Sequence, residues 1–216
     1  MKKLTLLLAG PTIMIYIGLI ICKSVLITFV LFYSWLLFVP LFSSIRNKQN
    51  KFKIKNQFNL QTIVVGIISG LISLLVIYVA VTLLKDTVFD LAALRQLLMD
   101  WNFTGDKVIG LVLVLIFINP FLEELYWREF MYKRLESKVS IAKTVVITSF
   151  FYSLYHLVSL IFIFTFPFNL IAVIPVFVAG LLWGYFRYKL QSITAPIISH
   201  TLADLGIMLV YLSYIL

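Results

Sequence analysis

Long apolar stretches, separated by short polar segments, dominate the 216-residue chain. Each is close to the roughly 20 residues that a helix needs to cross a bilayer. A lipid-exposed backbone must satisfy its own hydrogen bonds, so such stretches form helices. The pattern predicts an all-α, polytopic transmembrane helix bundle with about seven spans. Their expected bounds are Leu4–Cys22, Ser24–Phe42, Leu60–Leu84, Val108–Met131, Ile141 to a point before Pro167, Leu170–Phe186 and Ile193–Leu216.

Two segments between the expected spans carry signals of their own. Residues 85–107 combine four aspartates with leucine and phenylalanine residues near helical spacing, which predicts an amphipathic helix lying in the membrane interface. Pro167 and Asn169 interrupt the apolar pattern after the fifth span. An extra short or re-entrant segment within residues 157–170 would raise the number of spans to eight.

Composition supports a membrane protein, since 62% of the residues are hydrophobic and only 12% are charged. The net charge of +9 does not indicate nucleic-acid binding, because the densest basic run lies between two apolar stretches and fits a cytoplasmic loop. We therefore expect a cytoplasmic N-terminus and contact with membrane lipid. The expected location is the plasma membrane of a bacterium. The single Cys22 rules out an internal disulfide. The basic run consists of Arg46, Lys48, Lys51, Lys53 and Lys55.

The fourth expected span carries two adjacent glutamates and an arginine, Glu123, Glu124 and Arg128. An ionisable side chain near the bilayer centre costs roughly 2.5–3.5 kcal/mol, so such a cluster pairs inside the bundle or has a function there. The only two histidines of the chain, His156 and His200, also lie in apolar stretches. Carboxylates and imidazoles at membrane depth are the groups that a hydrolytic site needs.

Helical spacing groups these residues further. Glu124 and Arg128 lie one turn apart and predict a buried ion pair, which points to a structural rather than a catalytic role. Glu123 is rotated away from this pair, on the face of Asn119, and is left free to act as a base. Glu123 could instead form a polar contact between helices without a catalytic role. Each histidine, taken alone, would be interpreted in the same way. Two further pairs share the one-turn spacing: Tyr152 with His156, and His200 with Asp204.

Three motifs in this order resemble the CPBP family of intramembrane proteases, which includes type II CAAX prenyl endopeptidases and bacterial Abi proteins. They are Glu123-Glu124-Leu-Tyr-Trp-Arg128, Tyr152-Ser-Leu-Tyr-His156 and His200-Thr-Leu-Ala-Asp204. The family usually has phenylalanine at the first position of the second motif and asparagine at the last position of the third. On this resemblance the chain is a single integral membrane domain, in which residues 107–216 form the CPBP-like catalytic core. Residues 1–106 contribute the N-terminal spans, the basic loop and the interfacial segment.

The resemblance implies a role for each residue. Glu123 and His156 would activate a water, His200 and Asp204 would stabilise the oxyanion, and Glu124 with Arg128 would hold the helix, with Tyr152 and Asn119 in support. Zinc bound through Glu123, His156, His200 and Asp204 and a metal-free mechanism both stay open. Ionised aspartate only accepts hydrogen bonds, so Asp204 must be protonated, orient His200 or bind a metal.

We therefore expect an intramembrane endopeptidase that hydrolyses a hydrophobic or lipid-modified peptide near the cytoplasmic side, through a polar cavity that opens on that side. The alternative is a non-catalytic bacteriocin-immunity or peptide-binding protein on the same fold. An ion or proton transporter is a third reading, since such relays also use intramembrane acids and histidines. The chain lacks the matched broken helices that this reading requires.

Overall fold

A computed structural model of the chain describes residues 2–46, 58–105 and 108–216. Within these ranges the protein is helical and contains no strand. Seven helical stretches there are long and apolar enough to cross a membrane, so the predicted polytopic all-α bundle is confirmed with seven spans rather than eight. The stretches are Lys3–Ile21, Val25–Ile45, Leu60–Val88, Val108–Glu136, Ile141–Ile163, Phe168–Leu190 and Thr194–Ile215.

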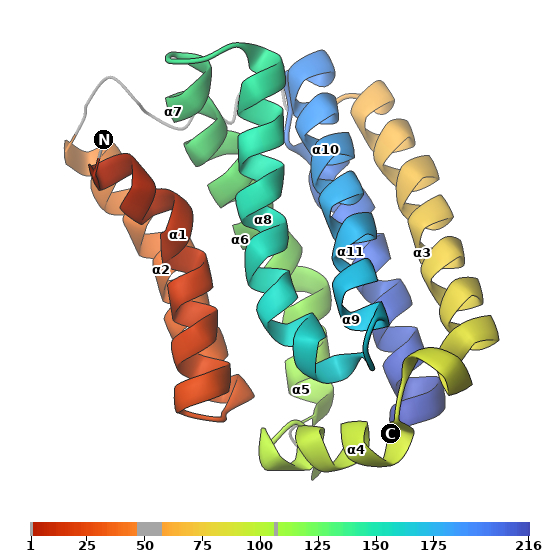
Figure 1. The fold of residues 1–216 in the computed structure, drawn as a ribbon. Coiled ribbons are helices and arrows are strands. Elements are labelled where there is room, and N and C mark those ends of the chain that lie inside the picture. The colour runs from red at the N-terminus through yellow and green to blue at the C-terminus, as the bar shows by residue number, and fades with distance from the viewer. Residues whose placement is uncertain (1, 47–57, 106–107) are drawn as a thin grey trace.

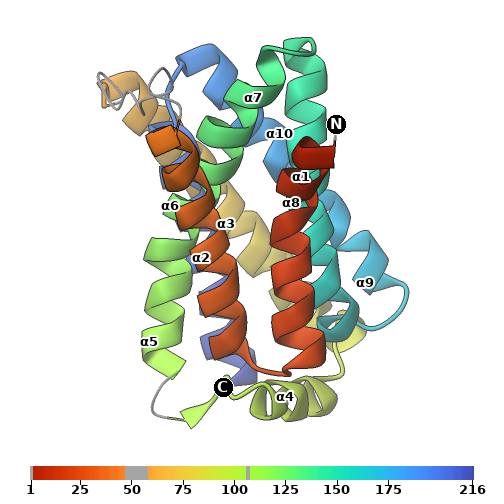
Figure 2. The ribbon, with the colours of Figure 1, turned by 90° about the vertical axis from the view of Figure 1, so that its left-hand side faces the viewer.

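The first two spans form a closely packed hairpin on one side of the bundle (Figures 1 and 2). Helix α1 (Lys2–Tyr16) continues as the π-helical turn η1 (Ile17–Ile21), and α2 (Val25–Arg46) runs back beside it. A Cβ atom on Gly10 would lie only 2.1 Å from the Trp35 ring. Glycine is therefore needed where the two helices cross.

Helix α3 (Leu60–Val88) lies at the opposite edge of the bundle, against α11 (Thr194–Val210) (Figure 1). The Asn59 side chain accepts from the Thr62 backbone N–H and starts α3. Gly66 and Gly70 face α11 so closely that an added Cβ would lie within 3.1 Å of its backbone. Only this narrow face is tightly packed, because most side chains along α3 are exposed, as expected toward lipid.

A short helix crosses the end of the bundle where the C-terminus lies (Figures 1 and 2). This is α4 (Leu91–Asp100), which begins where the Asp90 side chain accepts from the Ala93 backbone N–H at 3.0 Å. On this helix Leu94 is buried, whereas Arg95 is exposed and donates to the backbone oxygen of Ile215. The helix predicted within residues 85–107 is confirmed, and its place in the membrane interface stays a prediction.

The span that carries the glutamates alternates between α-helix and π-helix. Wider π-helical turns occur often at functional sites because they displace side chains from the regular helical face. Pro120 lies in the first turn of α6, where its missing N–H breaks no internal bond of that helix. The segments are α5 (Val108–Leu113), η3 (Val114–Ile118), α6 (Asn119–Glu124), η4 (Leu125–Met131) and α7 (Tyr132–Glu136).

The remaining spans complete the core. The chain breaks between Ile163 and Phe168, as the proline in this stretch predicts, but the short α9 adds no separate span because it leads directly into α10. Gln191 adopts a left-handed conformation with φ 51° and ends α10. The segments are α8 (Ile141–Ile163), α9 (Phe168–Ile171), α10 (Val173–Leu190), α11 and η5 (Tyr211–Ile215).

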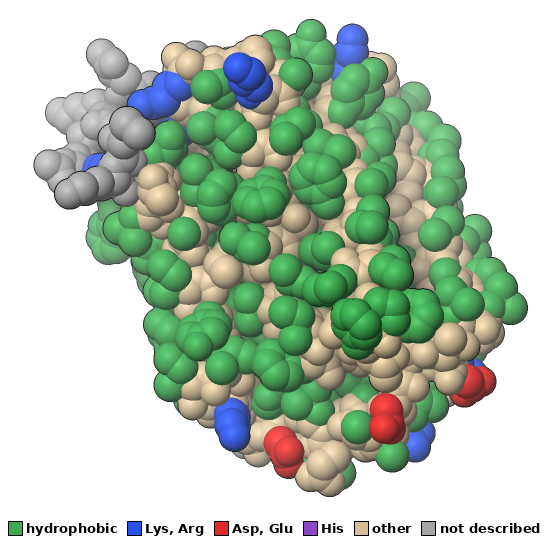
Figure 3. Space-filling view, viewed as in Figure 1, with side chains coloured by type: hydrophobic (Ala, Val, Ile, Leu, Met, Phe, Trp, Pro, Cys, Tyr) green, Lys and Arg blue, Asp and Glu red, His purple; other side chains and the backbone are tan. Residues whose placement is uncertain are grey.

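The two ends of the bundle differ from its middle. The N- and C-termini lie at opposite ends (Figure 1), as an odd number of spans requires. Hydrophobic side chains cover the middle of the face in Figure 3, whereas charged side chains gather toward the two ends. Such a band matches a lipid-facing surface. The basic run from Lys48 to Lys55 lies outside the described residues, as does the side chain of Arg46.

Candidate active site

A buried ion pair forms the structural base of the site. Glu124 Oε2 lies 3.2 Å from Arg128 Nε, and both side chains have no exposed surface. Arg128 also donates through Nη2 to the Gly180 backbone oxygen at 3.1 Å, which connects this helix to α10. The rings of Tyr152 and Trp183 flank the guanidinium, with centroids 4.7 Å and 5.5 Å from its carbon. The ion pair predicted from the one-turn spacing is confirmed.

His200 lies between the two adjacent glutamates. Its Nδ1 atom is 3.0 Å from Glu124 Oε1, and its Nε2 atom is 3.7 Å from Glu123 Oε2. The indole of Trp183 stacks on the imidazole with the centroids 4.1 Å apart and fixes the plane of the ring. Glu124 accepts from Nδ1–H of His200 through one oxygen and pairs with Arg128 through the other. The Nε2 atom is thereby directed toward Glu123.

Asp204 faces the same Nε2 atom, with Oδ1 3.5 Å away. Its other oxygen, Oδ2, accepts a hydrogen bond of 3.1 Å from the Asn119 amide. Asn119 lies on the face of Glu123, as the spacing predicts, since both line one cavity, and its amide reaches across to α11. Asn119 therefore positions Asp204 and connects α6 to α11.

His156 is held by its own helix. Its Nδ1 atom lies 2.9 Å from the Tyr152 backbone oxygen, so Nδ1–H donates to that carbonyl and Nε2 is left as the basic nitrogen. The hydroxyl of Tyr152 lies 3.4 Å from His200 Nε2. Tyr152, which replaces the usual phenylalanine of the motif, thus connects the second and third motifs through the hydroxyl that phenylalanine lacks.

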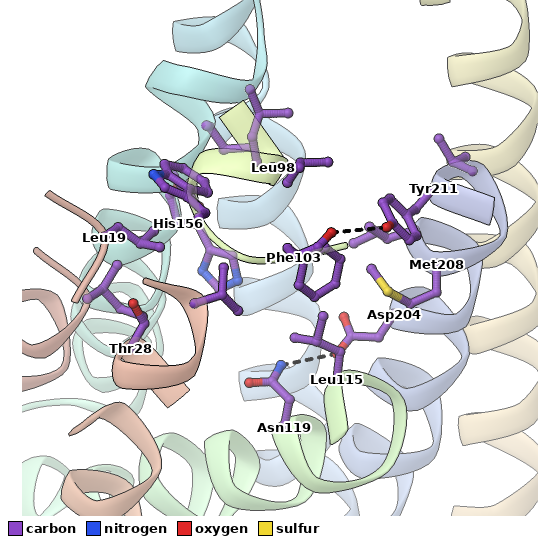
Figure 4. Close-up of a pocket in the computed structure, with 18 of the residues that line it drawn as sticks. Leu19, Thr28, Leu98, Phe103, Leu115, Asn119, His156, Asp204, Met208 and Tyr211 are labelled. Carbon is purple, nitrogen blue, oxygen red and sulfur yellow. Dashed lines mark hydrogen bonds between the residues drawn. The ribbon is translucent and has the colours of Figure 1, made fainter. Parts of the chain in front are cut away.

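A cavity of about 390 Å³ extends from Glu123, His156 and Asp204 toward one end of the bundle, whereas His200 and Tyr152 do not line it. Asn119, Glu123, His156 and Asp204 line it, and Figure 4 shows three of these residues around the open space, with a hydrogen bond between Asn119 and Asp204. Most other lining side chains are apolar. Those nearest α4 include Leu94, Leu98, Trp101 and Phe103, which extend the cavity toward that helix.

The direction and the polarity of this cavity differ from expectation. Counting residues along the helices suggested a polar cavity opening at the end with the basic loops. The cavity extends instead toward α4, because Leu98 and the loop after α4 supply its distant wall. It is also largely apolar, since polar side chains are concentrated beside Glu123.

The sequence leaves open both zinc, bound through Glu123, His156, His200 and Asp204, and a metal-free site. Among residues 2–46, 58–105 and 108–216, no group of three or more His, Cys, Asp or Glu side chains can hold a metal ion. The hydrogen bonds to Nδ1 of His200 and of His156 leave Nε2 of each ring facing the site, and Asn119 occupies one oxygen of Asp204.

Two aromatic residues at the site were missed by sequence reasoning. Trp183 of α10 stacks on His200 and donates from Nε1 to Ser199 Oγ at 3.1 Å. Tyr155 lines the cavity beside Glu123 and is fully enclosed. Trp183 lies outside the three motifs. Tyr155 is one of the intervening residues of the second motif, directly before His156, and sequence reasoning assigned it no role.

The fold and the site together define an integral, multi-pass membrane protein with carboxylates and imidazoles buried between its helices. Residues 105–206 match the family model described as "Type II CAAX prenyl endopeptidase Rce1-like", so the resemblance indicated by the three motifs is confirmed over this segment. The match points to a CAAX-protease-like intramembrane protease with a peptide substrate. No curated protein and no solved structure matches the chain.

Proposed function

We propose that this protein is an intramembrane endopeptidase that hydrolyses a peptide bond inside the bilayer. The proposal rests on one observation. Glu124 holds Nδ1 of His200, so that Nε2 faces Glu123 and Asp204 at the inner end of the cavity. An oriented imidazole beside a free carboxyl group is an arrangement suited to general acid–base chemistry. The family match over residues 105–206 supports the same reaction.

Glu123 is the general base in this mechanism. Its carboxylate lines the cavity and takes a proton from a water, while the Nε2 atom of His156 accepts the second hydrogen bond of that water. The hydroxide attacks the carbonyl carbon of the substrate and forms a tetrahedral intermediate. When the C–N bond breaks, the leaving amine takes the proton back from Glu123.

His200 and Asp204 stabilise the negative oxygen of the intermediate. A protonated His200 donates from Nε2, and its charge is balanced by Glu124 on the other side of the ring. Asp204 donates only when it is protonated, and otherwise it orients His200 from 3.5 Å. Glu124 and Arg128 do not line the cavity and act by holding His200 in place.

We retain a cytoplasmic N-terminus from the distribution of basic residues, and we keep a bacterial plasma membrane as the proposed location. In this orientation α4, which follows the third span, lies at the outer end of the bundle. The cavity extends toward that end. We therefore propose that a hydrophobic or lipid-modified peptide reaches Glu123 from the α4 end, in place of the cytoplasmic entry expected from the sequence.

The test is cleavage of hydrophobic and lipid-modified peptides by the purified protein in lipid nanodiscs, followed by mass spectrometry. Glu123→Gln, His156→Ala and His200→Ala are each expected to abolish the products while the protein stays folded. Glu136→Gln, which changes an exposed glutamate of α7, is the matched control and keeps full activity. Products that persist in Glu123→Gln would refute the proposed base.

A second function, peptide binding without catalysis as in bacteriocin immunity, is favoured by Asp204. An ionised aspartate beside His200 cannot donate to an oxyanion, and Asn119 already occupies one of its oxygens. Peptides that bind the protein but yield no Glu123-dependent product would support this function over proteolysis.

A further inference from the structure

The hydroxyl group of Tyr155 has no role in the mechanism derived above. Tyr155 lies on α8 directly before His156, its side chain is buried, and it lines the cavity together with Glu123. A buried tyrosine hydroxyl usually finds a hydrogen-bond partner. Within residues 2–46, 58–105 and 108–216, this hydroxyl makes no hydrogen bond of good geometry. Its position at the wall of the cavity therefore needs an explanation.

The carboxyl group of Glu123 is the acceptor that this hydroxyl can reach. The two groups lie close enough to interact as donor and acceptor. Oε2 of Glu123 is itself buried and lacks a hydrogen bond in the described part of the chain, since His200 Nε2 lies 3.7 Å away. Catalytic hydrogen bonds are often long or poorly aligned before a substrate binds, and they tighten afterwards.

The ring of Tyr155 is held from three sides, so its packing fixes the direction of the hydroxyl. The ring stacks on Trp127, with centroids 6.2 Å apart and planes 15° apart. Its centroid lies 4.4 Å from that of His156 and 5.1 Å from that of Phe32 on α2. Phe32 belongs to the N-terminal hairpin, which the family match over residues 105–206 does not include. This hairpin thus helps to place a group beside Glu123.

A second tyrosine of α8 provides a parallel. Tyr152 lies three residues before Tyr155, so both project from one face of the helix. The hydroxyl of Tyr152 is 3.4 Å from Nε2 of His200. The rings of the two tyrosines meet edge to face, with centroids 5.5 Å apart. Helix α8 therefore directs one hydroxyl toward His200 and the other toward Glu123.

We propose that Tyr155 is a positioning residue, which donates a hydrogen bond to one oxygen of Glu123 and so directs the other oxygen at the reacting water. This inference rests on the proposed function, because it assigns Glu123 the role of base. A carboxylate held at one oxygen by a fixed donor loses its rotational freedom. Holding a catalytic group in its reactive orientation contributes directly to the rate.

The kinetic test is Tyr155→Phe, which removes the hydroxyl and keeps the ring that contacts His156. In nanodiscs kcat is expected to fall by roughly 10- to 100-fold, because Glu123 loses its orientation. KM should stay within about twofold, since the ring still packs against its neighbours and one hydroxyl is the only change in the cavity wall. Native kcat in Tyr155→Phe would overturn the proposal.

Tyr132→Phe is the matched control. The hydroxyl of Tyr132 is also buried and also lacks a hydrogen bond within the described ranges, but Tyr132 does not line the cavity. This variant should keep native kcat and KM. An equal loss of kcat in both variants would show that Tyr155 acts only through the packing of the bundle, and the proposal would fail.

Infrared spectroscopy detects the hydrogen bond without relying on activity. The whole protein is studied in a detergent without ester groups, at a pH low enough to protonate Glu123. The C=O band of Glu123 is identified as the band that disappears in Glu123→Gln. A hydrogen bond lowers the stretching frequency of a carbonyl group, so the band should move to higher frequency in Tyr155→Phe and stay in place in Tyr132→Phe.

The two measurements separate this proposal from the function beneath it. A Glu123 band that does not move in Tyr155→Phe would overturn the proposal, even if the native protein cleaves peptides. A band that moves, in a protein that yields no Glu123-dependent product, would support the hydrogen bond and contradict the protease.

Discussion

The Nδ1 atom of His200 lies 3.0 Å from Oε1 of Glu124, while Arg128 Nε lies 3.2 Å from the other oxygen of the same carboxylate. Glu124 thus joins a fixed cation to an imidazole within the bundle. A carboxylate that orients a histidine fixes both its tautomer and its direction. Glu124 is therefore a positioning residue as well as half of a structural ion pair.

Glu124→Gln tests this positioning role. The amide keeps the volume of the carboxylate and can still accept hydrogen bonds, so we expect the protein to fold, with lower stability because Arg128 loses its counter-charge. The rate constant kcat should fall by roughly 10- to 1,000-fold, because the orientation and charge balance of His200 are lost. KM should change little, since Glu124 does not line the cavity. Steady-state kinetics in nanodiscs provide both values.

Glu124→Ala gives the contrasting result. It leaves Arg128 buried without its partner, which is expected to destabilise the protein by roughly 3–5 kcal/mol and to lower its yield. A Glu124→Gln protein with native kcat and reduced thermal stability would show that the residue has only a structural role.

Helix geometry explains which contacts could be predicted from the sequence. The Glu124–Arg128 pair and the approach of Asp204 to His200 follow from a one-turn spacing and are present. The Glu124–His200 and Asn119–Asp204 contacts join different helices, and they depend on how each helix is rotated and shifted against its neighbour. A single sequence does not determine those quantities. The direction of the cavity was misjudged for the same reason.

The spans themselves could be predicted from the sequence, whereas the ends of some helices could not. Hydropathy identified each span because about 20 apolar residues suffice to cross a bilayer. The third helix nevertheless continues to Val88, beyond the predicted Leu84, because the charged Lys85 and Asp86 end the apolar run but not the helix. The fourth continues to Glu136 for the same reason, since Lys133, Arg134 and Glu136 are charged but still helical.

Packing of α3 on α11 predicts a stability change at Gly70. A Cβ atom there would lie 2.7 Å from Leu202 Cδ1 and 3.0 Å from the Ser199 Cα. Gly70→Ala should therefore lower the free energy of unfolding by roughly 1–3 kcal/mol through overpacking. Thermal unfolding in one detergent, monitored by tryptophan fluorescence, measures the change.

Gly110→Ala is the matched control, since a Cβ atom at Gly110 meets no atom within 4 Å. Alanine favours a helix interior over glycine by up to about 1 kcal/mol, so this variant should be as stable as the native protein or more so. Equal destabilisation of the two variants would show that the close approach of α3 and α11 is not the reason why position 70 requires glycine.

Chelators are expected to leave the activity unchanged. The described side chains do not form a group that can hold a metal ion, and the derived mechanism uses Glu123 and His156 directly. Incubation with a strong zinc chelator, followed by the peptide assay and by elemental analysis of the purified protein, tests this. Loss of activity that returns when zinc is added would contradict the mechanism and would require the donors to rearrange around an ion.

The last prediction concerns Asp204, which has asparagine as its usual counterpart in the family. Asp204→Asn keeps the shape of the side chain and adds an N–H donor beside Nε2 of His200. The Asn119 amide can rotate to offer its oxygen in place of its nitrogen, so the contact between α6 and α11 survives. If Asp204 serves the oxyanion as a protonated donor, Asp204→Asn should keep kcat within about fivefold, whereas Asp204→Ala should lose about 100-fold or more. Loss of activity in Asp204→Asn with unchanged thermal stability would show instead that the negative charge of Asp204 is needed to orient His200.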